Sequence, residues 1–182
     1  MATTLTRWTV ADYHHMIASG LLSGRHVELI NGKIVDMAPE LPIHRATYRR
    51  GVKYLEALLK DQAVVFSAAP ITLPNDSEPE PDISIVQSPE SRYDEHHPGP
   101  SDIYWLIEVS NSTLTYDLGE KANLYAQHGI QDYWVIDIAN NQLWVHRQPQ
   151  DGTYQSIEKY KSGTITPVTM PSIEIKIDRL LK

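Results

Sequence analysis

The sequence has no cysteine among its 182 residues. This absence excludes disulfide bonds, thiolate zinc sites and cysteine nucleophiles. Any catalytic or metal site must therefore be built from carboxylate, histidine, lysine, serine or tyrosine side chains. With soft ligands missing, hard oxygen ligands are the expected partners of a metal ion.

Long hydrophobic runs are also missing. No stretch approaches the roughly 18 consecutive apolar residues that a membrane-spanning helix needs. The N-terminal sequence MATTLTRWTVADYHH lacks the basic and apolar regions of a secretory signal peptide. We therefore expect a cytoplasmic protein with no membrane partner.

Positive charge is scarce, with 16 Lys and Arg against 23 Asp and Glu and a formal net charge of -7. A protein that coats nucleic acid nonspecifically needs clustered Lys and Arg, because released counterions drive phosphate binding. The composition argues against such a protein but not against a local basic patch. Four basic residues fall within about 80° of one another around a predicted helix; they are Arg45, Arg49, Lys53 and Lys60. This group is a candidate for DNA contact, although such a charge run can also be a solvated helix face.

The hydrophobic content of 41% is that of a globular chain with a real core. At this length one domain is the default. We expect a helical N-terminal extension over residues 1–25, a core over residues 26–147 and a β extension over residues 148–182.

Changes in hydrophobic period along the chain predict a mixed α/β domain, with helices on at least one face of a central sheet. Helices are expected at residues 9–20, 44–61 and 117–128, the last ended by Gly129. A hairpin is expected at residues 26–37 around the Asn31-Gly32 turn. Strand-like runs are at residues 63–69, 71–73, 83–86, 103–109, 133–138, 142–147, 154–160 and 173–177.

Three ionisable residues interrupt apolar patterns. Glu108 lies inside the most hydrophobic strand, and Asp82 opens the strand at residues 83–86. Lys121 lies within about 60° of Tyr125 and Leu118 on the apolar face of its helix. Burying a charge is expensive unless it is paired or bound to a metal.

Each of these residues also has a simpler interpretation. Lys121 could reach water along the apolar face, Glu108 could be neutralised by an arginine, and Asp82 could cap a turn. Together they predict a charge-compensated cluster, since two carboxylates at strand ends and an inward lysine account for one another. Such a cluster suits Mg²⁺, which commonly takes one or two protein carboxylates and leaves places for phosphate oxygens.

The segment Pro81-Asp82, followed by a strand that carries Glu108-Val109-Ser110, resembles the PD-(D/E)XK signature of restriction-endonuclease-like nucleases. More closely, the chain resembles the restriction endonuclease family called Uma-two over roughly residues 26–147. The matching segments are residues 27–35, 37–39, 81–86, 106–110, 112–113 and 133–137, with His44, Asp117, Lys121, Tyr125 and Gly129. The resemblance implies a mixed central β-sheet flanked by helices, with an α-β-β-β-α-β core and extra strands at the C-terminus.

The resemblance also assigns roles to individual positions. Asp82 and Glu108 match the carboxylates that bind Mg²⁺ or Mn²⁺. The usual motif has a lysine two residues after the glutamate, where this chain has Ser110, and Lys121 on the next helix matches the displaced lysine. Glu28, His44 and Tyr125 match further family positions, and together with Ser110 they are possible additional site residues.

The main hypothesis is a Mg²⁺-dependent endonuclease that acts on DNA, as a homodimer because two active sites most simply cut two strands. An alternative is a catalytically inactive protein of the same fold that binds nucleic acid or protein. A third hypothesis is a glycosidase that uses Asp82 and Glu108 as an acid and base pair. An inward Lys121 argues against it, because a nearby cation lowers the pKa of the acid.

Overall fold

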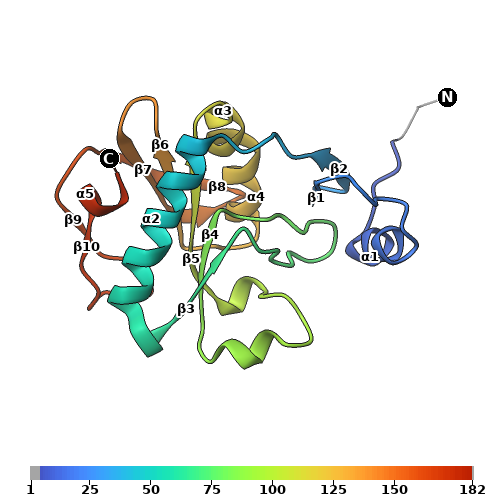
Figure 1. Cartoon of the computed structure of the whole chain (residues 1–182), viewed down its shortest axis with the longest axis horizontal. Helices are drawn as coiled ribbons and strands as arrows, with labels where there is room; N and C mark the ends of the chain where they lie inside the picture. Colours follow the sequence, from blue (N-terminus) through green and yellow to red (C-terminus); the bar gives the residue numbers. More distant parts are fainter. Residues whose placement is uncertain (1–4, 182) are drawn as a thin grey trace.

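The most apolar segments of the chain form the centre of a six-stranded mixed sheet (Figure 1). The computed structural model describes residues 5–181. The strand order is β3-β4-β5-β6-β7-β8, and only β5 and β6 are parallel among these described strands. The strands are β3 Val64–Ser67, β4 Ile83–Val86, β5 Ile103–Ser110, β6 Asp132–Asp137, β7 Gln142–Gln150 and β8 Thr153–Tyr160.

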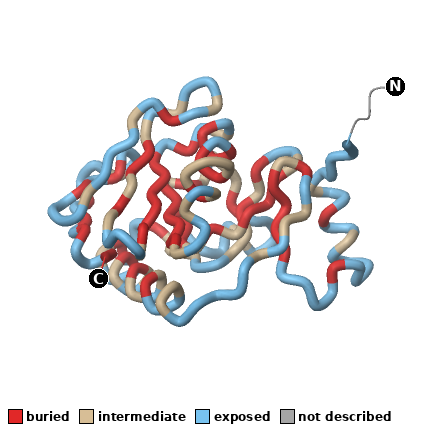
Figure 2. The backbone as a smooth tube through the Cα atoms, turned by 90° about the horizontal axis from the view of Figure 1, so that it is seen from above, coloured by how far each residue is buried: buried red, intermediate tan, exposed pale blue. Residues whose placement is uncertain are grey.

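Strand β5 is buried on both faces, which explains its nearly continuous apolar sequence. Trp105, Ile107 and Val109 lie in the core beneath α2 (Pro42–Leu59). Leu106 lies in the opposite core with α4 (Ala122–Gln127). Figure 2 shows the central strands as the most continuously buried part of the chain. The predicted α-β-β-β-α-β order is confirmed by α2, β3, β4, β5, α4 and β6.

Helix α2 packs closely on the sheet. It begins at Pro42, where a proline suits the first helical turn, two residues before the predicted start. Gly51 permits the close approach, because a Cβ atom there would lie 3.1 Å from Cδ1 of Ile83. On the side of α2 that faces the sheet, Leu55 and Leu59 are fully buried, whereas Tyr48 and Val52 are only partly covered.

The connection from β5 to β6 is helical but irregular. It starts with α3 (Leu114–Tyr116), earlier than the predicted residue 117. A π-helical turn follows at Asp117–Lys121 and leads into α4. Such turns are rare in helices and are often found at functional sites.

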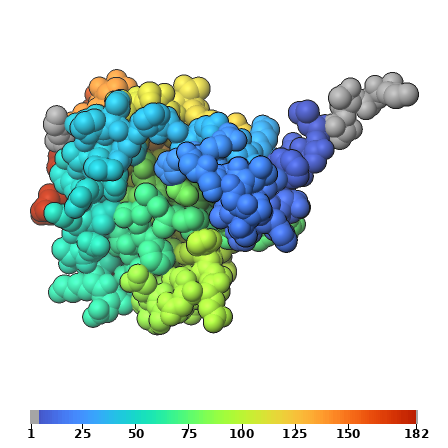
Figure 3. All heavy atoms as spheres, turned by 45° about the vertical axis from the view of Figure 1, so that its right-hand side comes forward, coloured from blue at the N-terminus to red at the C-terminus, as the bar shows by residue number. Residues whose placement is uncertain are grey.

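The N-terminal part projects from the body of the molecule (Figures 1 and 3). Helix α1 (Val10–Ala18) is capped by Thr9, which forms a capping box with Asp12. Strands β1 (Val27–Ile30) and β2 (Lys33–Asp36) form the predicted hairpin. Its turn has φ values of 49° at Asn31 and 71° at Gly32, as a type I′ turn requires.

The remaining elements correct some expectations. Residues 71–73 lie in a buried connection that forms only an isolated bridge at Leu73, not a strand. Of residues 173–177, only β10 (Ile175–Lys176) is a strand, paired with β9 (Thr164–Ile165). Ile177 instead starts α5 (Ile177–Leu180), whose side chains join the core under α2. Short 3-10 helices are η1 Lys60–Gln62, η2 Glu90–Tyr93 and η3 Pro100–Asp102.

Two expected boundaries can be placed on this fold. Residue 147 falls inside β7, so the expected core and C-terminal extension share one sheet. Residues 1–4 of the expected N-terminal extension, and residue 182, lie outside the described part. Within residues 5–181, no helix is long and apolar enough to cross a membrane.

One buried histidine makes the stability of this fold depend on pH. His146 on β7 is 1% exposed and packs against Tyr133 and Tyr154. Burial lowers the pKa of His146 from 6.5 to about 4. Below pH 6.5, His146 therefore becomes protonated in the unfolded chain but stays neutral in the folded chain. The free energy of unfolding falls as the pH drops toward 4. We expect this histidine to remove up to about 3 kcal/mol of the free energy of unfolding over that interval.

Urea unfolding at several pH values between 7 and 4 tests this expectation. His146→Phe keeps an aromatic ring in the cluster and removes the titration. Its free energy of unfolding should fall less steeply with acid than that of the wild type. Parallel curves for the two proteins would rule out His146 as the cause.

Candidate active site

The strand register brings Asp82 and Glu108 together. Ile83 pairs with Ile107 in an antiparallel arrangement. Asp82, which precedes Ile83, therefore lies beside Glu108, which follows Ile107. The backbone N–H of Asp82 lies 3.4 Å from Oε2 of Glu108. Val109 donates its backbone N–H to Oδ2 of Asp82 at 2.7 Å. Neighbouring antiparallel strands thus hold both carboxylates in place.

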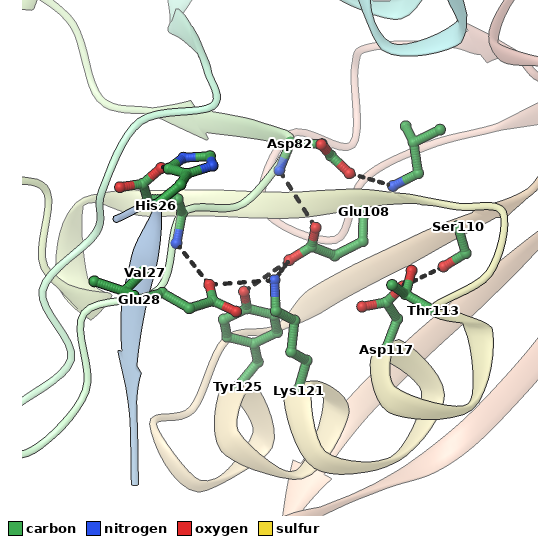
Figure 4. Close-up of polar contacts among 12 residues, drawn as sticks. His26, Val27, Glu28, Asp82, Glu108, Ser110, Thr113, Asp117, Lys121 and Tyr125 are labelled. Carbon is green, nitrogen blue, oxygen red and sulfur yellow. Dashed lines mark hydrogen bonds and ion pairs between the residues drawn. The ribbon is translucent and has the colours of Figure 1, made fainter. Parts of the chain in front are cut away.

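The crossover helix supplies the counter-charge to Glu108. Side chains alternate across β5, so Glu108 lies on the face that α4 covers. Lys121 and Tyr125, one helical turn apart, each donate to Oε1 of Glu108 at 3.0 Å (Figure 4). Lys121 is buried, so the prediction of an inward lysine is confirmed and snorkelling to water is excluded.

Glu28 from the N-terminal hairpin completes the cluster. Its Oε2 lies 3.5 Å from Nζ of Lys121 and accepts the backbone N–H of Glu80 at 3.2 Å. Only 3% of Glu28 is exposed. A single ammonium group therefore contacts carboxylates from β1 and β5, which lie in different sheets.

The cluster carries more negative than positive charge. Burial raises the pKa of Glu108; the Lys121 ammonium opposes this rise, and Asp82, Asp117 and Glu28 add to it. Burial by itself would lower the pKa of Lys121, but Glu108 and the other carboxylates more than offset this and raise it. Lys121 therefore stays protonated at neutral pH. The surplus of carboxylates leaves the site suited to a further cation.

His44 from the first turns of α2 contacts the other carboxylate. Its Nε2 lies 3.1 Å from Oδ2 of Asp82, and its Nδ1 lies 3.5 Å from Oε1 of Glu40, without hydrogen-bond geometry. Burial by itself would lower the pKa of His44, but the hydrogen bond and charge of Asp82, with Glu40, raise it to about 9. The imidazolium thus contacts the same oxygen of Asp82 as the backbone N–H of Val109.

Ser110 occupies the position where the usual motif has a lysine, but it does not join this cluster. Its hydroxyl donates to Oδ2 of Asp117, and the hydroxyl of Thr113 donates to the same oxygen at 2.6 Å. Asp117 begins the π-helical turn that ends at Lys121. Ser110 thus orients the start of the helix that carries the lysine.

These groups lie in a cleft of about 500 Å³. The hairpin, the segment before α2 and the start of the crossover helix form its walls. The charged or ionisable side chains that line it include seven carboxylates, two histidines, Arg45 and Lys121. The seven carboxylates are Glu28, Asp36, Glu40, Glu80, Asp82, Glu108 and Asp117.

The candidate basic patch on α2 is exposed but lies mostly outside the cleft. Arg45 lines the cleft and forms an ion pair with Glu40 at 2.7 Å. Arg49 and Lys53 are exposed on α2 and do not line it. Their contact with DNA stays a prediction.

No group of three or more His, Asp and Glu side chains within residues 5–181 converges as a metal site. The expected ligand set was smaller, because Mg²⁺ keeps several waters and often uses one or two protein carboxylates. Asp82 and Glu108 are two carboxylates that the fold brings together.

Two features of the site had no clear signal in the sequence. Asp117 is buried beside Lys121, yet its position on a predicted helix resembled an ordinary first-turn acid. Residues 37–41 line the cleft although they read as a connection between hairpin and helix. In the sequence, only the resemblance marked Asp117, as one of the matching positions.

Comparison with known proteins identifies the family of the chain and a solved structure with a similar fold. Residues 10–178 match the family Uma2, described as "Putative restriction endonuclease". A crystal structure of a putative nuclease belonging to DUF820 from Anabaena variabilis has a TM-score of 0.64 at 22% identity, covering 85% of this chain and 88% of that chain. At this identity the likeness shows the fold, and the predicted fold class is confirmed. No curated protein matches the chain.

Removing the ammonium group from the cluster should destabilise the protein. Lys121→Met leaves Glu108 and Glu28 buried without their counter-charge, which we expect to cost about 3 kcal/mol of the free energy of unfolding at neutral pH. Adding Glu108→Gln removes one of the two buried carboxylates that have lost their counter-charge. This second substitution should restore part of the lost free energy of unfolding. Chemical denaturation of the two single variants and the double variant measures the coupling. Strictly additive losses would show that Lys121 and Glu108 do not stabilise one another.

Proposed function

The chain belongs to the Uma2 family of putative restriction endonucleases, and we propose that it is a metal-dependent endonuclease that hydrolyses DNA phosphodiester bonds with Asp82, Glu108 and Lys121. One observation carries this proposal. Two carboxylates on neighbouring strands and a buried lysine from the crossover helix meet in one cleft. This is the donor set that metal-assisted phosphoryl chemistry needs.

The residues present fit a divalent cation. Asp82 and Glu108 supply hard oxygen ligands, and the site has an excess of carboxylates over its one lysine. Asp82 and Glu108 would hold Mg²⁺ or Mn²⁺. The bound ion supplies a Lewis acid that offsets negative charge on the phosphate.

Lys121 acts as a fixed positive charge in this proposal. Because its pKa is raised, it stays protonated and is not a general base at neutral pH. In hydrolysis a water oxygen bonds to phosphorus while the P–O ester bond breaks, and negative charge grows on the phosphate oxygens. A preorganised ammonium beside the phosphate stabilises that charge without having to reorganise.

Two neighbours position the carboxylates. Tyr125 donates to the same oxygen of Glu108 as Lys121, which leaves Oε2 turned toward Asp82. His44 and the backbone of Val109 both bind Oδ2 of Asp82. Such second contacts fix a ligand's orientation and commonly affect metal affinity.

The proposal includes a homodimer in the cytoplasm. Two copies would bring two active sites to one DNA molecule, one for each strand. A copy that acts alone would nick one strand at a time.

A catalytically inactive binding protein is the second candidate. The observation that favours it is Ser110 at the usual lysine position, where its hydroxyl is occupied by Asp117. Metal binding and strand cleavage, measured separately, distinguish the two candidates.

The wild-type protein should bind Mn²⁺ in calorimetric titration, and Asp82→Asn should weaken that binding at least about tenfold. The reason is that the substitution removes one of the two hard anionic ligands. Glu56→Gln is the matched control, since it removes one exposed carboxylate from α2 outside the cleft. Equal affinity in all three proteins would exclude Asp82 as a ligand.

With Mg²⁺ present, the wild type should nick supercoiled plasmid, whereas Glu108→Gln and Lys121→Met should be slower by about 100-fold or more. Lys176→Met removes an exposed lysine away from the cleft and should retain the wild-type rate. Circular dichroism checks that each variant is folded at the assay temperature. Nicking at equal rates in all four proteins would point to a contaminating nuclease, and no nicking by the wild type would favour the inactive binding protein.

A further inference from the structure

The cleft has an apolar wall that the proposed hydrolysis does not use. Met37, Ala38, Pro39 and Leu41 lie in the connection between β2 and α2 and line the cleft. Leu41 is 48% exposed, and Ala38 and Pro39 are also exposed. Grouped exposed apolar side chains at the edge of a cleft commonly mark a ligand-binding surface.

Aromatic rings from two different helical segments face the same space. Tyr48 of α2 lines the cleft, with its ring centroid 5.9 Å from that of His44. Tyr116 lines it from α3. The Tyr116 hydroxyl is buried and has no hydrogen-bond partner in the described part of the chain. A buried hydroxyl without a partner is unusual in a native protein and is a donor that a ligand can satisfy.

The cleft is too acidic to bind a DNA double helix along its phosphate backbone. Among the described residues that line it, Arg45 and Lys121 are the only permanent cations, and each already has a carboxylate partner. Seven carboxylates share the cleft with them. Duplex DNA presents one phosphate charge per roughly 1.7 Å of its axis, and its binding depends on many Lys and Arg contacts.

The size of the cleft agrees with a smaller occupant. Its volume of about 500 Å³ is typical of pockets for small ligands. Proteins that bind single strands use aromatic side chains on which unpaired bases stack, and this contact tolerates any base sequence. A base held against the apolar wall would place its own phosphate toward the carboxylates at the floor of the cleft.

From this combination we infer that the substrate is an unpaired DNA strand, in which one unstacked base packs against Tyr48 and the apolar wall while its phosphate reaches Asp82 and Glu108. The inference rests on the proposed function, because it names the substrate class of that same site. A single strand, an internal bubble or a frayed end would offer such a base. A fully paired duplex would offer none.

Fluorescence anisotropy tests binding separately from cleavage. The full-length Glu108→Gln variant, with Mg²⁺, is titrated into one labelled DNA sequence as a single strand, as a perfect duplex and as a duplex with an internal bubble. We expect the single strand and the bubble to bind at least about tenfold more tightly than the perfect duplex. Equal or tighter binding of the perfect duplex would overturn the inference.

Substitutions at Tyr48 locate the contact. In the same background, Tyr48→Ala should weaken binding of the single strand about tenfold, while Tyr48→Phe keeps the stacking ring and should bind as before. Trp8→Ala is the matched control, because Trp8 is 40% exposed and lies outside the cleft. No change in Tyr48→Ala, or an equal loss in Trp8→Ala, would contradict the inferred contact.

Cleavage assays with the wild type separate the two proposals. If the wild type cuts the perfect duplex as fast as the single strand, the inferred substrate class is wrong and the nuclease proposal stands. If Glu108→Gln prefers the single strand but the wild type cuts nothing, the nuclease proposal fails and the binding inference stands. Preferential cutting of the single strand and the bubble supports both.

Discussion

A lysine ammonium buried between carboxylates of two different sheets is the interaction on which this site depends. Lys121 contacts Glu108 of the central sheet and Glu28 of the N-terminal hairpin. Taking these charges out of water costs several kcal/mol for each ion, and only good geometry repays it. The crossover helix, the sheet and the hairpin must therefore stay in register with one another. The surplus negative charge that remains suits a divalent cation.

The architecture separates stability from chemistry. Two hydrophobic cores, one on each face of the sheet, hold β5 rigidly along most of its length. Asp82 lies directly before β4, and Glu108 lies two residues before the end of β5. Because neighbouring backbones fix their spacing, Asp82 and Glu108 need little further ordering before a ligand arrives. Helix α2 adds a contact from His44 to Asp82, so each carboxylate is held by at least two groups.

The structure shows where part of the negative charge of the chain is located. A net charge of -7 argued against nonspecific binding of nucleic acid, and the cleft concentrates seven carboxylates in one place. A divalent cation held by Asp82 and Glu108 would offset the charge of that pair, so phosphate binding and metal binding would become coupled. The apolar wall and the tyrosines offer a source of affinity that does not depend on positive charge. Both features favour a short unpaired segment over a long duplex contact.

The sequence by itself determined the order of helices and strands, the hairpin and the inward direction of Lys121. These features follow from local patterns, since burial on both faces makes β5 apolar throughout and a helix places Lys121 and Tyr125 on one face. A charged residue inside such a pattern is costly, so Glu108 was visible as a site residue. Asp82 was visible at the start of another strand, and the resemblance to a nuclease motif then matched both carboxylates.

Only the tertiary structure decided which groups meet. The pairing of Ile83 with Ile107 sets Asp82 beside Glu108, and no local pattern encodes a strand register between distant segments. The π-helical turn, the burial of Asp117 beneath Ser110 and the approach of Glu28 likewise depend on packing between elements. The strand-like run at residues 71–73 became a buried connection, because apolar residues satisfy a core in either conformation. Periodicity thus shows which side chains turn inward, whereas long-range packing decides what they face.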